Sequence, residues 1–435
     1  MKVKTLRVSL LIVAMMLLTA CPKNDPVSVD PDFNVTGTST SSFKATFTEQ
    51  TIYFDSTELS DIVSIDSVNY IFEFKKSSVK ANELEKDKIL LIYGLALRKV
   101  VGVNKSGNTI VVETGEAALN DAIEDGEMEW NSYCNFDPAS ASNMQMKVGK
   151  ETFYPTFQGN DEISFKFKYG DIDYSLTMKL ENTSAYCKFS ASKTLGGAIK
   201  GKFETEGRIS AFNSANKIVI KKRELQDFQH NNNDMKGDLT LSLSAAGSGN
   251  AKIDFTPTIF SLVYPMMVGP IPIFIRLKMQ FVINAVVPLD ASALLSINFK
   301  YDSRTGFTYD KNQFSGNNLW DALKVTANAG QYRITNNKNQ GGSSTAMAAN
   351  YGIGFPRIEV GIGPPGTPFE DILVPWIQTA FLIGHDFTVH PLCMRTQASF
   401  IGGMGYDFKL FKIKQSGSKN LWKLDTLIHK TGECP

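Results

Sequence analysis

The chain has few histidines and no excess of charge of either sign. Four histidines stand among 435 residues, and 45 lysines and arginines balance 44 aspartates and glutamates. A balanced chain creates no field that attracts nucleic acid or an anionic lipid surface. The scarcity of histidine leaves few side chains for metal ligation or for proton transfer near neutral pH. We therefore expect no nucleic-acid partner and no cofactor.

Sequence motifs of catalysis are also absent. The chain contains no G-x-S-x-G nucleophile elbow, no H-E-x-x-H zinc helix and no phosphate-binding P-loop. His385 and His390 form the only compact group of potential metal ligands, together with Asp386 and Cys393. Two histidines five residues apart on a strand point to opposite faces, whereas zinc needs three or four converging ligands. We expect no metal site there.

Alternation of apolar and polar residues is the dominant pattern. It runs through residues 163–169, 172–180 and 238–244. Such alternation is typical of antiparallel sheets with one face in water. The aromatic content of 11 % also suits strands. The sequence predicts a mainly β fold of antiparallel sheets, in a sandwich or elongated architecture, with a few short helices.

The most apolar segment after the first twenty residues covers Ile259 to Leu289. Prolines interrupt it, and polar residues alternate with apolar ones from Ile273 to Val286, so it predicts a long buried strand and not a membrane helix. A groove for a lipid or another apolar ligand is an alternative.

The chain divides into a first module, residues 43–130, and a large β-rich body, residues 131–435. Within the module, β-rich runs flank Lys105 to Asn108 and predict a hairpin. Glu116 to Asp125 is predicted as a helix, with Thr114 as its cap and Gly126 after its end. In the body, Gln229 to Asp234 contains three consecutive asparagines and is expected to be an exposed loop.

Four cysteines, Cys134, Cys187, Cys393 and Cys434, lie beyond the first twenty-one residues. They permit two disulfides in three pairings. The favoured pairing is Cys134 with Cys187 and Cys393 with Cys434, because each pair lies within one region of the chain. Four free thiols are the alternative.

The first twenty-one residues carry Lys2, Lys4 and Arg7, then an apolar run from Val8 to Leu18, and end in Leu18-Thr19-Ala20-Cys21. This pattern resembles a bacterial lipoprotein signal with its lipobox, as in Bacteroidota. The resemblance implies a signal peptide over residues 1–20, cleavage before Cys21 and diacylglycerol on its thiol. Residues 21–42, rich in proline, serine and threonine, are then expected to be a flexible tether.

The segment Leu97 to Gly126 resembles uncharacterised exported β-rich bacterial proteins, which implies a structural module. We expect a non-enzymatic lipoprotein of the outer membrane, anchored by Cys21, with a protein, glycan or lipid as partner. Whether the body faces the periplasm or the cell surface is left open. A glycan-binding or glycan-hydrolysing surface protein, using Trp320, Trp376 or Trp422, is one alternative, and a carrier of an apolar ligand is another.

Overall fold

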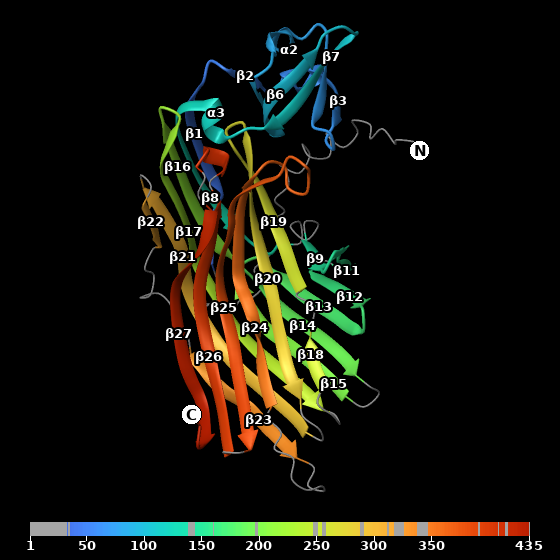
Figure 1. The fold of residues 1–435 in the computed structure, drawn as a ribbon, viewed down its shortest axis with the longest axis vertical. Coiled ribbons are helices and arrows are strands. Elements are labelled where there is room, and N and C mark those ends of the chain that lie inside the picture. The colour runs from blue at the N-terminus through green and yellow to red at the C-terminus, as the bar shows by residue number, and fades with distance from the viewer. Residues whose placement is uncertain are drawn as a thin grey trace.

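The computed structural model describes residues 33, 35–137, 144–159, 161–195, 199–246, 251–254, 258–287, 291–310, 313–316, 326–336, 347–389, 392–407, 409–413 and 416–434. Most of them lie in strands, and all the strand pairs among them except β2 (Thr51–Phe54) with β5 (Ile89–Ile92) are antiparallel, which confirms the predicted mainly β class. The elements form a small module at one end of an elongated body made of two sheets (Figure 1). None of the helices in this part of the chain is long and apolar enough to cross a membrane.

Three sheets account for the described strands. The module sheet contains β2 (Thr51–Phe54), β3 (Ile62–Asp66), β4 (Ile71–Lys75), β5 (Ile89–Ile92), β6 (Ala96–Asn104) and β7 (Thr109–Glu116), with the helices η4 (Glu58–Asp61) and α2 (Val79–Glu83). The first body sheet contains β1 (Thr40–Phe47), β8 (Ile123–Cys134), β11 (Thr156–Gln158), β12 (Glu162–Tyr169), β13 (Ile172–Glu181), β14 (Ser184–Leu195), β15 (Ile199–Ser210), β16 (Phe212–Lys221), β17 (Glu224–Ala246), β21 (Ala291–Asp310), β22 (Gln313–Gly316) and β23 (Thr326–Asn336). The second body sheet contains β9 (Met144–Val148), β10 (Glu151–Phe153), β18 (Ala251–Asp254), β19 (Thr258–Val268), β20 (Ile271–Val287), β24 (Met347–Ile362), β25 (Asp371–Val389), β26 (Leu392–Asp407) and β27 (Ser416–Gly432). Two further helices, α3 (Leu119–Ala122) and η7 (Lys409–Phe411), lie outside the sheets.

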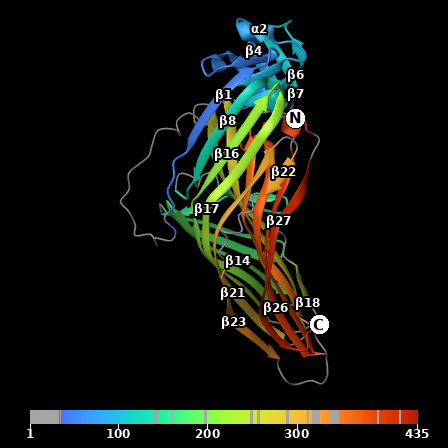
Figure 2. The same ribbon diagram turned by 90° about the vertical axis from the view of Figure 1, so that its left-hand side faces the viewer.

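The strand β17 is the spine of the first body sheet. β15 and β16 follow each other along one side of β17, and β21 pairs with its other side. Beyond β15 and β16 the sheet forks, because β14 pairs with β15 whereas β8 pairs with β16. The upper and lower parts of the body therefore share continuous long strands (Figure 2).

The two body sheets pack face to face around one apolar core. Stacked rings join them, with 3.6 Å between the ring centroids of Phe189 and Phe281. Phe165 meets Phe260 edge-on at 6.0 Å. Alternate residues of β20, from Ile271 to Ile283, point into this core, as the period-two pattern predicts. The body is a sandwich.

The module docks on the body through the loop between β24 and β25. Phe369 of this loop belongs to the core cluster of the module and stacks on Phe72 at 5.4 Å between ring centroids. The backbone N–H of Gly94 donates to the carbonyl of Pro270, and that of Gly363 donates to the carbonyl of Pro272. The bond from Gly363 orders the start of the loop between β24 and β25, which we call the docking loop.

The module sheet is shorter than the module predicted over residues 43–130. β1 and β8 pair with each other and with β16 in the first body sheet, so the module sheet covers only residues 51–116. The predicted hairpin around Lys105 to Asn108 is confirmed as β6 and β7. Alternation identified the strands but carried no information on which sheet each would join.

Three local predictions are corrected. The predicted helix Glu116 to Asp125 shrinks to Leu119–Ala122, because pairing with β1 draws the residues from Ile123 onward into β8. The predicted tether ends earlier than residue 42, since Phe33 and Val35 are buried and β1 starts at Thr40. Gln229 to Asp234 is no loop but part of β17, where Gln229 to Asn232 pair with β16 on one side and β21 on the other.

Candidate functional site

Two rows of side chains on the inner face of the first body sheet are largely polar. Strand register places Trp130, Asn216, His230 and Phe307 side by side across β8, β16, β17 and β21. The next row contains Ser132, Ser214, Asn232 and Thr305 on the same strands. We call these eight residues the polar rows. All of them are buried, in a sandwich core that is otherwise almost entirely apolar.

His230 is the centre of the polar rows. Its Nδ1 lies 2.6 Å from Oδ1 of Asn216, and its Nε2 lies 2.8 Å from Nδ2 of Asn232. Because Nδ2 of Asn216 donates to the carbonyl of Ser214, Oδ1 must be the acceptor, so the imidazole proton is on Nδ1. Burial lowers the pKa of His230 to about 3. The ring is therefore neutral, with both nitrogens in use.

Two polar atoms in the rows have no hydrogen-bond partner among the described residues. They are Nε1 of Trp130, a donor, and Oδ1 of Asn232, an acceptor. Trp130 is 2 % exposed and Asn232 is fully buried. Leaving such groups unpaired costs about 1–3 kcal/mol each. Unpaired buried groups of this kind require an explanation beyond packing.

A crevice opens at the edge of the sandwich beside the polar rows. It has a volume of about 170 Å³ and is lined by Ser39, Ser132, Tyr133, Val263, Tyr264, Pro265 and Met266. It lies between the upper part of β19 and the pair β1 and β8. The hydroxyl of Tyr133 donates to the carbonyl of Val35, and that of Tyr264 donates to the carbonyl of Asn135. Both phenol rings are thereby fixed in place.

Ser132 belongs to both the crevice and the polar rows. Its hydroxyl lies 2.8 Å from Sδ of Met266 on β19. A thioether is a weak acceptor, so a better acceptor would displace it. Ser132 thus links the surface crevice to the buried polar side chains around His230.

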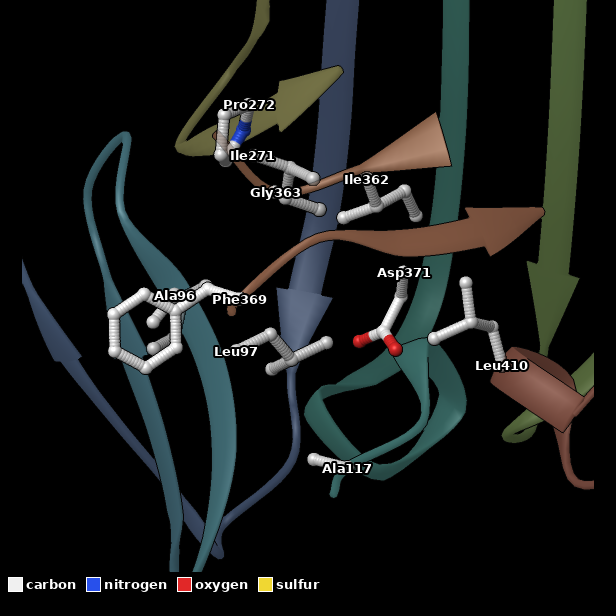
Figure 3. A pocket seen from close by; sticks show the side chains of 11 residues that line it. Ala96, Leu97, Ala117, Ile271, Pro272, Ile362, Gly363, Phe369, Asp371 and Leu410 are labelled. Carbon is white, nitrogen blue, oxygen red and sulfur yellow. The ribbon is translucent and has the colours of Figure 1, made fainter. Parts of the chain in front are cut away.

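A second cavity lies where the module meets the body (Figure 3). Asp371 points into it among apolar side chains that include Leu97, Phe369 and Leu410. The cavity volume is about 10 Å³, which is room for about one water molecule. Burial raises the pKa of Asp371, although the positive charge of Arg98 opposes this shift. The cavity is too small for an organic ligand.

Arg98 and Arg276 lie on the two sides of the same interface, Arg98 on β6 of the module and Arg276 on β20 of the body. The guanidinium of Arg98 lies 4.2 Å from the ring centroid of Tyr70, and its Nε donates to Thr114. On the body, Nη2 of Arg276 donates to both carboxylate oxygens of Glu370, at 2.8 and 2.7 Å. Its Nη1 donates to Glu359, which also pairs with Lys278. Burial lowers the pKa of Lys278. These charges attach the docking loop to β20 and have a structural role.

Of the two predicted disulfides, Cys393–Cys434 is confirmed and Cys134–Cys187 is wrong. Cys393 and Cys434 form a disulfide with an S–S distance of 1.99 Å. Cys134 and Cys187 are free and buried. Cys134 lies opposite Phe212 on β16 and Cys187 opposite Gly207 on β15. Those positions are about 16 Å apart along the strand line, far beyond the roughly 7 Å that a disulfide permits. Burial raises the pKa of Cys187 to about 12, so its thiol is unreactive.

Several predicted residues fall outside the described part of the chain. Cys21, His390 and Trp320 belong to undescribed segments, and the side chains of His385, Trp376 and Trp422 are likewise outside it. Among the described residues, no three histidines, cysteines, aspartates or glutamates gather as metal ligands would.

Sequence reasoning missed the polar rows. The signal was present, because Phe228, His230 and Asn232 continue a period-two pattern in which alternate residues face the core. The run of asparagines obscured it. What the rows and the crevice offer chemically is a set of neutral donors and acceptors with fixed aromatic walls. Comparison of the chain with family models, curated proteins and solved structures gives no match.

Proposed function

We propose that the chain is an outer-membrane lipoprotein, anchored through an acylated Cys21, whose β body has a non-enzymatic binding or structural role. The anchor rests on the resemblance of Leu18 to Cys21 to a lipobox. The role of the body rests on its construction as one continuous sandwich with a rigidly docked module. The observation that carries the proposal furthest is the docking of Phe33 and Val35 on the body.

That docking sets the length of the tether. Phe33 and Val35 are each 8 % exposed, and Arg208 lies over the ring of Phe33 at 5.9 Å. Only residues 22–32 then separate Cys21 from the folded body. Twelve residue steps span at most about 40 Å. The 23 residues of β17 alone extend about 75 Å at 3.3 Å per residue. An acylated Cys21 would therefore hold the body close to the bilayer.

The docked module supports a structural or binding role. Phe369 stacks on Phe72 of the module, and the ion pair of Arg276 with Glu370 fixes the loop that carries Phe369 to the body. A module held in this way presents its surface in a constant orientation to a partner.

The apolar-carrier alternative gains nothing from the described residues. Inner-face residues of β19 and β20, such as Phe260 and Phe281, are buried against the first body sheet. For the glycan-binding alternative, the feature that bears on it is the crevice beside Ser132.

Fractionation of cells that express a Cys21→Ala variant tests the anchor. We expect the wild-type protein in the outer-membrane fraction and the variant in the soluble fraction, with unchanged thermal unfolding. Ser28→Ala, a substitution between Cys21 and Phe33, is the control. We expect the Ser28→Ala protein to remain in the membrane fraction. A Cys21→Ala protein that still sediments with membranes contradicts the proposal. Protease treatment of intact cells distinguishes a cell-surface body from a periplasmic one.

A further inference from the structure

We propose that a band of exposed aromatic side chains across the first body sheet contacts the lipid bilayer in which the acyl chains of Cys21 are anchored. The contact rests on the anchor proposed above and adds to it an orientation of the body. Among the described residues, three aromatic side chains stand out as strongly exposed. Tyr154 is 71 % exposed, Phe157 is 57 % exposed and Tyr186 is 39 % exposed. We call these three residues the aromatic band.

The three residues of the aromatic band lie close together in the sheet. Phe157 is on β11, and its register partners on β12, β13 and β14 are Ile163, Met178 and Cys187. Tyr186 precedes Cys187 on β14. Three strand spacings therefore separate Phe157 from Tyr186, which is about 15 Å. Tyr154 lies in the link between β10 and β11, three residues before Phe157.

The backbone under the aromatic band is held in place. Phe153, which precedes Tyr154, stacks on Phe167 of β12 at 3.8 Å between ring centroids. Phe167 in turn stacks on Tyr174 of β13 at 5.3 Å. The rings of Tyr154 and Phe157 thus project from a packed part of the sandwich. Exposed apolar surface on a packed scaffold marks a site of interaction.

The tether ends beside the aromatic band. Phe33, the first described residue, lies under the guanidinium of Arg208, 5.9 Å from it. Arg208 on β15 is the register partner of Tyr186 on β14, so these two residues are about 5 Å apart across the sheet. Phe157 is four strand spacings from β15, about 20 Å. The aromatic band therefore starts where the folded chain hands over to the tether.

The length of the tether brings the bilayer to the same place. Twelve residue steps separate Cys21 from Phe33. A flexible segment of that length has a root-mean-square span of roughly 20 Å. This span equals the extent of the aromatic band away from Phe33. A bilayer that holds Cys21 thus lies, on average, within reach of Tyr186, Phe157 and Tyr154.

The chemistry of the aromatic band suits a lipid surface. Tyrosine is enriched at membrane interfaces, because its ring enters the apolar region while its hydroxyl stays in water. The charges nearby are of both signs, since Arg208 pairs with Glu181 at 3.3 Å and Lys179 lies opposite Glu162. Such a band offers no net charge to select anionic lipid. Its contact with the bilayer is therefore made by the rings.

Fluorescence of an introduced tryptophan tests the contact. The acylated full chain is reconstituted in vesicles of phosphatidylcholine, or of phosphatidylcholine brominated on its acyl chains, which quenches only tryptophans that touch the lipid. The probes are Tyr154→Trp and Phe157→Trp, each read as the difference from the wild type. We expect the added fluorescence to fall at least twofold in brominated vesicles, and equally so when anionic phosphatidylglycerol is mixed in.

Two further variants show whether the contact is local and whether the rings make it. Leu427→Trp replaces a side chain that is 53 % exposed on β27, which ends the second body sheet on the side opposite β10 (Figure 1). This control is expected to keep its fluorescence. Tyr154→Ser, combined with Phe157→Trp, removes the neighbouring ring. It is expected to halve the quenching at least, with thermal unfolding unchanged.

The contact is refuted if neither Tyr154→Trp nor Phe157→Trp is quenched in vesicles that carry the protein. Equal quenching of Leu427→Trp would also overturn it, because the body would then touch lipid without a preferred face. So would quenching that Tyr154→Ser leaves unchanged. Flotation of the same vesicles separates this test from that of the anchor. A protein that floats without quenching keeps its anchor and loses only the contact, whereas a protein that does not float contradicts both.

Discussion

At the scale of single residues, His230 is the side chain whose environment differs most from water. It is fully buried, and both ring nitrogens are engaged by asparagine side chains. The folded protein therefore holds a neutral imidazole at pH values where the unfolded chain would carry a proton. Folding is thereby linked to pH through one identifiable group.

His230 should make the protein less stable as the pH falls below about 6.5. The pKa of about 3 in the folded state lies below the unfolded value, so the unfolded state binds more protons in this window and stability rises with pH. The loss is at most about 1.4 kcal/mol per pH unit between about 6.5 and 3. Denaturant unfolding from pH 4.5 to 8 measures it.

A His230→Gln variant isolates this effect. Glutamine can donate to Asn216 and accept from Asn232 but does not titrate, so its stability should depend less steeply on pH. His429→Gln on the exposed strand β27 is the matched control and should follow the wild type. Parallel pH curves for the wild type and His230→Gln would contradict the assignment.

At the scale of elements, the disulfide Cys393–Cys434 fastens the end of β27 to β26. β27 is the last strand of its sheet and most of its described residues are exposed. It buries little surface to hold itself in place. The covalent link compensates for that weak packing.

Removing the disulfide should loosen β27 before the rest of the sandwich. The sequence separation of 41 residues corresponds to about 4 kcal/mol on the chain-entropy model. We expect a Cys393→Ala, Cys434→Ala double variant to unfold at lower denaturant and to exchange amide hydrogens faster over β27. Added reductant should lower the unfolding midpoint of the wild type but not that of the double variant. A Cys187→Ala variant controls for loss of a thiol, and equal exchange rates in β27 would refute the expectation.

Elements with strict period-two patterns were predictable from the sequence. The strands over residues 163–169, 172–180 and 273–286 appear as β12, β13 and β20. Predictions failed where a distant partner decided the local conformation. Ile123 lies in a strand because β1 offers it a partner, and Asn231 lies in a strand because β16 and β21 flank it. Neither partner can be read from neighbouring residues.

The candidate site was less predictable than the fold for the same reason. The polar rows are assembled from strands that begin at residues 123, 212, 224 and 291. A serine or asparagine on any one of these strands reads as an ordinary polar residue. Only the register across four strands makes them a cluster, and register is a tertiary property.

At the scale of the whole molecule, the module and the body are joined by one aromatic side chain in particular. Phe369 is 7 % exposed and contacts both Phe72 and Tyr70 of the module. A module sheet of six short strands buries few apolar side chains of its own. The ring of Phe369 is therefore a substantial part of its stability.

A Phe369→Ala variant should release the module while leaving the sandwich folded. Buried phenylalanine to alanine substitutions cost about 3–5 kcal/mol. We expect limited proteolysis to cut the module faster than in the wild type, while the fragment from β8 onward stays intact. Phe157→Ala, at a ring that is 57 % exposed, is the control and should change stability by less than about 0.5 kcal/mol. Uniform destabilisation without faster cleavage of the module would count against this division.

The position of Phe369 also affects when the module can complete its folding. The module sheet ends at residue 116, yet the side chain that completes its core arrives from residue 369. A chain that emerges from a ribosome or a translocation pore does so from its N-terminus, so the first sheet in sequence must wait for most of the chain. Contacts between such distant residues also slow folding. The module, although it comes first in the sequence, therefore cannot complete its core until residue 369 is in place.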